Sequence, residues 1–184
     1  RGAESNGGRA PSGFCIRKFL WDYNQLTFHD RPANYAYLRM AEIHLAYAEA
    51  LNETGQKSKA YKELDKVRNR VGLPDMSDAL LHRLQSGKVL PSYAECALEG
   101  DAELREEILD ERARELISEE NRRMTLVRTN TLAERIKLNG DVEPAAPSNK
   151  VITGFDANIH TLLPIPLTEI QLNKDGDLKQ NPGY

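Results

Sequence analysis

The fold of this chain is decided by the stretch YLRMAEIHLAYAEALNE, which runs from Tyr37 to Glu53. Its apolar residues recur at spacings of three and four, the period that places side chains on one buried face of an α-helix. Many alanines accompany this stripe, and such small side chains let a second helix approach closely. We therefore expect a helix over residues 34–52 that ends near Gly55, a residue suited to a left-handed C-cap. The stripe consists of Leu38, Ala41, Leu45, Ala48 and Leu51.

A second helix is predicted to follow after a short loop. Ser58 is its expected N-cap, a buried stripe runs from Ala60 to Val67, and Gly72 with Pro74 closes it. The two helices then form an antiparallel pair, which is either a generic helical hairpin or one tetratricopeptide unit. Because the period does not repeat clearly elsewhere in the chain, the pattern alone leaves both interpretations open.

The rest of the chain is predicted to combine helices with long irregular connections, so the expected fold class is mostly α. The C-terminal segment from Asn149 to Tyr184 has little helical periodicity. In that segment, Leu162, Ile165 and Ile170 are expected to contribute to the core. The other expected elements are a short helix around Leu80–Leu84, a helix over about 101–121, an apolar surface from Met124 toward Asn130, and a short helix over Leu167–Leu172.

Composition and charge exclude several functional classes. The 184 residues carry a formal net charge of -3, without the basic excess typical of nucleic-acid-binding domains. No apolar run is long enough for a transmembrane helix. Residues 1–13 are polar and rich in glycine, so we expect a flexible lead-in there and no signal peptide. Cys15 and Cys96 form no CxxC or zinc pattern, and the sequence leaves open whether they are thiols or a disulfide.

Several motifs follow one another in a characteristic order. The stretch Tyr37–Glu53 is similar to the pattern R-x-A-E-x-x-L-x-x-A-E-A-x-N, and Val67–Pro74 is similar to V-R-x-R-A-G-L-P. Farther along, residues 108–122 are similar to E-R-R-R-E-L-x-x-E-G-x-R-W-x-D-L-R-R. The chain then carries L-P-I-P from Leu163, E-I at Glu169, and the closing Q-N-P-G-Y.

In this order and spacing, the motifs resemble the C-terminal half of the SusD/RagB family, with coverage from about Phe14 to Tyr184. The sequence departs from the third pattern at four positions, where the family usually has Gly, Trp, Asp and Arg. These positions are Glu120, Arg123, Thr125 and Val127. The resemblance implies that residues 1–184 are the C-terminal part of a SusD/RagB-like domain, with a tetratricopeptide-like helical scaffold.

The resemblance also implies a function. Members of this family are lipid-anchored proteins on the outer surface of Bacteroidetes-type cells, where they cap a SusC-like TonB-dependent transporter. They hold glycans, or in some members peptides, for import without breaking bonds. The family's lipidated cysteine lies at the mature N-terminus, a position that neither Cys15 nor Cys96 occupies. The expected anchor to the outer membrane therefore lies outside these residues.

One row of carboxylates could carry chemistry, namely Glu107, Glu111, Glu115 and Glu119. Such a row could bind a metal or act in acid–base catalysis, but no Glu-x-x-His partner of the di-iron kind accompanies it. Arginines lie three and four residues away, where each ion pair stabilises a helix by roughly 0.2–0.5 kcal/mol. We therefore predict an ion-pair network, no catalytic residue and no metal or other cofactor. The arginines are Arg112, Arg114, Arg122 and Arg123.

The predicted ligand contacts are the aromatic residues Trp21, Tyr23 and Phe28. Aromatic faces suit the apolar faces of sugar rings, while the polar tips of Trp and Tyr can bond to hydroxyl groups. The competing interpretation is that these side chains pack their segment onto the helical body. A second functional hypothesis is a tetratricopeptide-like adaptor that binds a peptide or helix. A glycosidase would need two opposed carboxylates in a cleft, and the sequence nominates no such pair.

Overall fold

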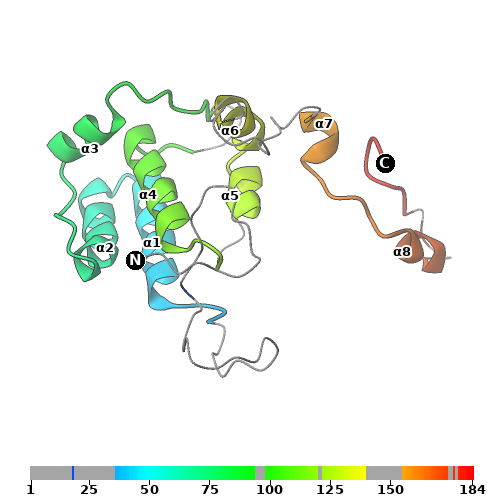
Figure 1. The fold of residues 1–184 in the computed structure, drawn as a ribbon, viewed down its shortest axis with the longest axis horizontal. Helices are drawn as coiled ribbons and strands as arrows, with labels where there is room; N and C mark the ends of the chain where they lie inside the picture. The colour runs from blue at the N-terminus through cyan, green and yellow to red at the C-terminus, as the bar shows by residue number, and fades with distance from the viewer. Residues whose placement is uncertain are drawn as a thin grey trace, which may run out of the picture. The chain divides into compact units, whose positions relative to one another are not determined.

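The structure is a computed structural model that describes residues 18, 36–93, 98–119, 122–139, 155–173, 176 and 178–184. All regular secondary structure in these residues is helical (Figure 1), which confirms the mostly α fold class with a tetratricopeptide-like hairpin. The chain divides into two compact units, residues 1–90 with 97–122, and residues 91–96 with 123–184. The helices are α1 (Met40–Glu53), α2 (Lys57–Arg70), α3 (Asp78–Gln85), α4 (Ala102–Glu115), α5 (Arg122–Arg128), α6 (Leu132–Asn139), α7 (Ala157–His160) and α8 (Leu167–Leu172).

Helices α1 and α2 form the predicted hairpin, and a short loop makes them antiparallel. Gly55 adopts φ 73° and its amide donates to the Asn52 carbonyl, while the next amide, of Gln56, donates to the Leu51 carbonyl. This pair of bonds is a Schellman motif, which glycine favours because it has no Cβ to clash at positive φ. Gly72, with φ 77°, ends α2 in the same way.

In the hairpin, the starts of the two helices were predicted less accurately than their ends. Helix α1 begins at Met40, later than the expected residue 34. The N-cap of α2 is Gln56, so the prediction of Ser58 was wrong. The reason is local: the Schellman motif at Gly55 already turns the chain, and the Gln56 carbonyl accepts from the amides of Lys59 and Ala60. Ser58 therefore lies inside the first turn of α2.

Helix α4 completes the core of the first unit by packing against α1 and α3 (Figure 1). Seven side chains of this core have no exposed surface, and burying each of the five leucine and isoleucine side chains among them contributes about 1.5–3 kcal/mol relative to leaving it in water. Leu45 and Leu64 belong to the stripes predicted for the two hairpin helices, and their burial confirms this part of the prediction. The five are Leu45, Leu64, Leu81, Leu104 and Ile108.

The start of α4 lies very close to the end of α1. Asp101 caps α4 by accepting from the amide of Leu104 at 2.8 Å. A Cβ added at the preceding Gly100 would lie 2.5 Å from the carbonyl oxygen of Asn52. Only glycine allows the two backbones to approach this closely.

Helix α4 is shorter than expected, because it ends at Glu115 instead of near residue 121. Ser118 follows with φ 65°, a left-handed conformation that breaks the helical path before α5 begins. Asn130, with φ 51°, likewise ends α5. Helices α6 and α7 were not predicted, because short helices carry too few turns for a clear periodic signal.

In the second unit, the closing Q-N-P-G-Y motif binds the L-P-I-P stretch. The side-chain amide of Gln180 accepts from the Ile165 amide at 2.7 Å and donates to the Ile165 carbonyl at 2.8 Å. Asn181 donates to the Leu163 carbonyl at 2.7 Å. Helix α8 has the predicted bounds. The prediction that Leu162 is a core residue was wrong, since this side chain is exposed, and Ile165 is only partly buried.

Candidate functional site

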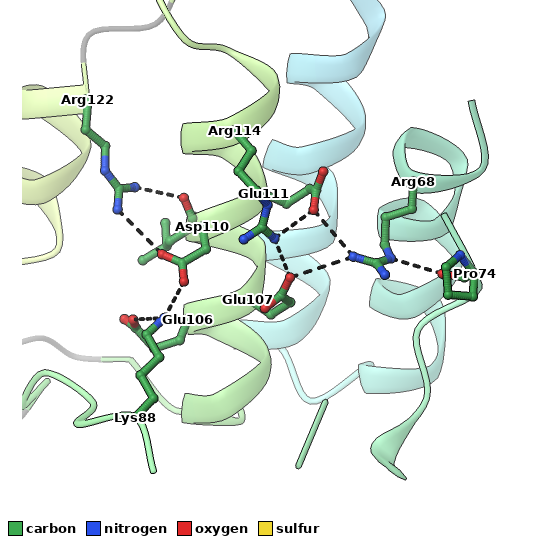
Figure 2. A network of polar contacts seen from close by, with 10 residues as sticks. Arg68, Pro74, Lys88, Glu106, Glu107, Asp110, Glu111, Arg114 and Arg122 are labelled. Carbon is green, nitrogen blue, oxygen red and sulfur yellow. Dashed lines mark hydrogen bonds and ion pairs between the residues drawn. The ribbon is translucent and has the colours of Figure 1, made fainter. Parts of the chain in front are cut away.

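The structure describes all four carboxylates of the predicted row, of which Glu107, Glu111 and Glu115 lie on α4 and Glu119 lies in the turn after it. Glu107 and Glu111 are each only 3% exposed, so they lie inside the helical unit instead of on a solvated face. Arg114 donates to the carboxylates of both, at 2.8 Å to Glu111. Arg68, from α2, places its guanidinium 3.7 Å from Glu107 and 3.5 Å from Glu111 (Figure 2). Both carboxylates are thus shared between two arginines.

The environment of Glu107 changes its protonation equilibrium. Burial raises the pKa of the Glu107 carboxyl, and the Arg114 guanidinium offsets this only in part. A raised pKa occurs in catalytic acids, but also in buried ion-pair networks. Arg68 also donates to the carbonyl of Pro74 at 3.1 Å, which ties the network to the loop after α2 (Figure 2). These contacts support the interpretation that the row stabilises the fold.

The other two carboxylates form a second group, which we call the α4 end cluster: Glu115 and Glu119 with Lys18, Arg39 and Arg70. Arg39 donates to Glu115 at 2.5 Å and to Glu119, while Arg70 contacts Glu115 at 2.7 Å. Lys18 lies 2.5 Å from Glu119. Burial alone would raise the pKa of Glu119, but hydrogen bonds from Arg39 and Lys18 lower it. Three cations from distant parts of the chain therefore contact these two carboxylates, and two of the cations, Arg39 and Lys18, favour the charged form of Glu119.

A third group of charges lies on another face of α4. Glu106 has no exposed surface, and its carboxylate is 3.6 Å from the ammonium group of Lys88. The same lysine pairs with Asp110, which also lies 3.9 Å from Arg122 (Figure 2). Arg122 donates to the carbonyl of Leu109 at 2.8 Å as well. These contacts fasten the segments that precede and follow α4 to the helix.

The predicted ion-pair network is confirmed, but the predicted pairings of Arg112 and Arg123 were wrong. Of the four predicted arginines, Arg114 is the one whose described contacts include glutamates of the row, namely Glu107 and Glu111. Arg112 lies 3.9 Å from Glu42 of α1, and Arg123 donates to the carbonyls of His160 and Thr161 in the second unit. The prediction considered partners on the same helix, whereas the cations come mostly from other segments. No spacing rule within one helix could have found them.

The charged residues of the first three motifs pair with one another. From the R-x-A-E motif, Arg39 binds Glu115. From V-R-x-R, Arg68 binds Glu111 and Arg70 binds Glu115. The two carboxylates belong to the third motif, on α4. These residues therefore join the three helices to one another through ion pairs.

The other predicted positions give no site within the described residues. Trp21, Tyr23 and Phe28 lie outside the part of the chain that the structure describes, as do Cys15 and Cys96 and the lead-in of residues 1–13. Across the described ranges, no group of three or more His, Cys, Asp or Glu side chains is arranged to hold a metal ion. None of the described helices is long and apolar enough to cross a membrane.

Comparison with known proteins agrees with this architecture. The sequence pattern of the SusD family matches residues 1–184. The chain is also 35% identical, over 156 residues, to the SusD-like protein P2 of Formosa agariphila. That alignment covers 84% of this chain and 27% of the relative, so the chain spans less than a third of the relative's length. No solved structure matches the chain. The match over its whole length shows that this chain belongs to the SusD family.

Proposed function

We propose that this chain is the C-terminal part of a non-catalytic, surface-exposed protein that captures glycans or other nutrients. Its ligand would pass to a SusC-like TonB-dependent transporter in the outer membrane, and a lipid anchor outside these residues would hold the protein there. The observation that carries the proposal is membership of the SusD family over residues 1–184.

The chemistry of α4 supports binding over bond-breaking. A glycosidase needs one carboxylic acid and one carboxylate that flank the substrate. Glu107, Glu111, Glu115 and Glu119 are each engaged by one or more cations, which fixes their orientation toward the helical unit. Moving one of them toward a substrate would leave a buried or half-buried arginine without its partner, at a large cost.

Trp21, Tyr23 and Phe28 are the proposed ligand contacts. A glycan has apolar ring faces and many hydroxyl groups, so aromatic stacking combined with hydrogen bonds suits it. Binding by three such rings would be moderate in affinity and reversible, as transfer to a transporter requires.

The proposal is tested by isothermal titration of the full chain with soluble polysaccharides of different linkage and charge. We expect saturable binding to one or more of them and no release of reducing ends on prolonged incubation. The variants Trp21→Ala, Tyr23→Ala and Phe28→Ala should weaken binding, with Trp21→Ala raising Kd about tenfold, equivalent to about 1.4 kcal/mol.

Tyr47→Ala is the matched control, because Tyr47 is an exposed aromatic residue on α1 outside the proposed contacts. This variant should bind as the parent chain does. Absence of binding to every polysaccharide and to peptides would contradict the proposal, and so would glycan cleavage that requires a carboxylate of α4.

A tetratricopeptide-like adaptor is the alternative function. Ile43 and Tyr47 are exposed on one face of α1, four residues apart, as contacts for a bound peptide or helix would be. In this case Tyr47→Ala would weaken peptide binding, while Trp21→Ala would leave it unchanged. The same two variants therefore separate the two functions.

A further inference from the structure

The exposed face of helix α2 is basic. The helix packs against α1 (Figure 1), and Ala60, Leu64 and Val67 bury its apolar stripe in the core. Six residues of α2 are exposed, of which four are cations and none is an acid. We call these four cations the basic row. They are Lys59, Lys62, Lys66 and Arg70.

The spacing of the basic row places its members next to one another. They follow at intervals of three, four and four residues, so all of them lie on one face of the helix. At a rise of 1.5 Å per residue, neighbouring cations are about 4.5–6 Å apart along the helix axis. Like charges at this spacing repel one another and destabilise a helix. Helix stability alone therefore does not favour this row.

The first half of the row carries charge that the described contacts leave uncompensated. Lys59 donates to the side-chain carbonyl of Gln56 at 2.7 Å, and this partner is neutral. Within the part of the chain that the structure describes, no carboxylate contacts Lys62. The first turn of α2 also contains no acidic residue, so the positive end of the helix dipole adds to the charge of Lys59.

The second half of the row lies above its acidic partners. Lys66 pairs with Glu63 at 2.7 Å, and Arg70 pairs with Glu115 at 2.7 Å. The side chains of the two acids are only 14% and 9% exposed, whereas those of the two cations are 52% and 56% exposed. Glu115 is also shared with Arg39. The cations therefore form the outer layer of this face, and a surplus of positive charge remains along it.

We propose that the basic row binds the acidic groups of an anionic polysaccharide. The inference rests on the proposed function and narrows its ligand from glycans in general to glycans that carry carboxylate or sulfate groups. Cations along a helix form a linear array, and such a polymer presents a linear array of acids. Lysine contacts an acid as a point charge, and arginine can form a bidentate pair with it. Each contact at an exposed cation is weak, so binding is reversible.

Two other negatively charged partners fit this face less well. Duplex DNA carries one charge per about 1.7 Å, roughly three times the charge density of the row. Single-stranded nucleic acid stacks its bases on aromatic side chains, and the six exposed residues of α2 include none. A helix that lies in a membrane surface needs a free apolar face, whereas the apolar stripe of α2 is buried in the core. Charge complementarity therefore favours the polysaccharide.

The test compares three polymers that share one backbone: dextran, carboxymethyl-dextran and dextran sulfate. Their binding to the full chain is measured by isothermal titration at about 0.05 M salt, where screening is weak. We expect saturable binding of both charged polymers and much weaker binding of dextran. The double variant Lys59→Gln, Lys62→Gln should raise Kd for the charged polymers about fivefold, as the loss of two surface ion pairs predicts. At about 1 M salt, where the Debye length is about 3 Å, this difference should disappear.

A matched control removes two charges elsewhere. Arg83→Gln, Lys137→Gln alters exposed positions of α3 and α6 outside the row, and it should leave Kd unchanged. The variant Lys59→Arg, Lys62→Arg keeps both charges and should keep the affinity of the parent chain. Glutamine and arginine are both good helix formers, so circular dichroism should show the helical fold retained in every variant.

Three results would each overturn the inference: charged dextrans that bind no better than dextran, a Kd that responds equally to the row and control variants, or equal affinity for a DNA duplex. If neutral polysaccharides still bind in these cases, the proposed function stands. Absence of binding to every polysaccharide would reject both proposals.

Discussion

Arg105 holds Glu53 by two parallel hydrogen bonds of 2.6 Å each, one from Nε to Oε1 and one from Nη2 to Oε2. This pair joins the start of α4 to the end of α1. Arg105 is only 2% exposed, and it also donates to the Gly100 carbonyl at 3.1 Å. Burial by itself raises the pKa of Glu53, but the bonds from Arg105 and from the Gly100 amide lower it below the ordinary value.

Removing one partner of this pair is expected to destabilise the fold strongly. Arg105→Ala leaves the Glu53 carboxylate without its bidentate partner, which for a buried pair costs about 3–5 kcal/mol. The free energy of unfolding from urea denaturation is the measurement. Lys66→Ala is the control, because the exposed Lys66–Glu63 pair on α2 should contribute less than about 1 kcal/mol. Equal losses from both substitutions would contradict the assigned role of Arg105.

Gly100→Ala is expected to destabilise the first unit because the added Cβ meets the backbone of Asn52. Overpacking against backbone cannot be relieved by a rotamer change, so we expect a loss of about 3 kcal/mol. Gly87→Ala is the comparison without a steric contact: no atom lies within 4 Å of its added Cβ, and Gly87, unlike Gly100, has a positive φ, of 74°. This control isolates the cost of positive φ, roughly 1 kcal/mol. Thermal unfolding of both variants measures which substitution destabilises the protein more. A smaller loss of stability for Gly100→Ala than for Gly87→Ala would show that the backbones at Gly100 and Asn52 are not tightly packed.

Two glutamates of the same row are expected to affect stability with opposite dependence on pH. The folded-state pKa of Glu119 is lowered, so its contribution is present above the unfolded value of 4.5 and is lost as pH falls through the folded pKa. The folded-state pKa of Glu107 is raised, so the protonated group favours folding, and this contribution is lost as pH rises from 4.5 through the folded pKa.

Glu119→Gln and Glu107→Gln make this difference measurable. The free energy of unfolding of each variant is subtracted from that of the parent chain between pH 3 and pH 7, a range chosen around the ordinary carboxyl pKa of about 4.3. The difference should increase with pH for Glu119→Gln and decrease with pH for Glu107→Gln. Parallel curves would mean that the two carboxyl groups share one environment, contrary to the contacts described.

The C-terminal motif gives a prediction for the second unit. Gln180→Ala removes both hydrogen bonds to Ile165, each with a net contribution of about 0.5–1.5 kcal/mol. Hydrogen exchange at the Ile165 amide should accelerate in this variant. Gln171→Ala, at an exposed position in α8, is the control and should leave that amide protected. Unchanged exchange at Ile165 after loss of Gln180 would show that this bond does not protect it.

Local patterns in the sequence predicted the hairpin well. The three-and-four spacing from Ala41 to Leu51 identifies the buried face of α1, and glycines 55 and 72 mark the helix ends because only a residue without a side chain adopts positive φ at low cost. Helix starts were harder to predict, since Gln56 caps α2 through its backbone and not through a side chain. The aromatic residues proposed to bind ligand stay a prediction.

The sequence by itself determined the helical character, the family, and the expectation that acidic and basic residues of the successive motifs form ion pairs. Only the tertiary structure decided which charges meet. Glu111 pairs with Arg114, three residues away, and also with Arg68 of α2, while Glu115 binds Arg39 and Arg70 from two other segments. Periodicity reports which face of a helix is buried, whereas ion pairs between helices depend on how the helices are packed, and that is set by the shape of the whole core.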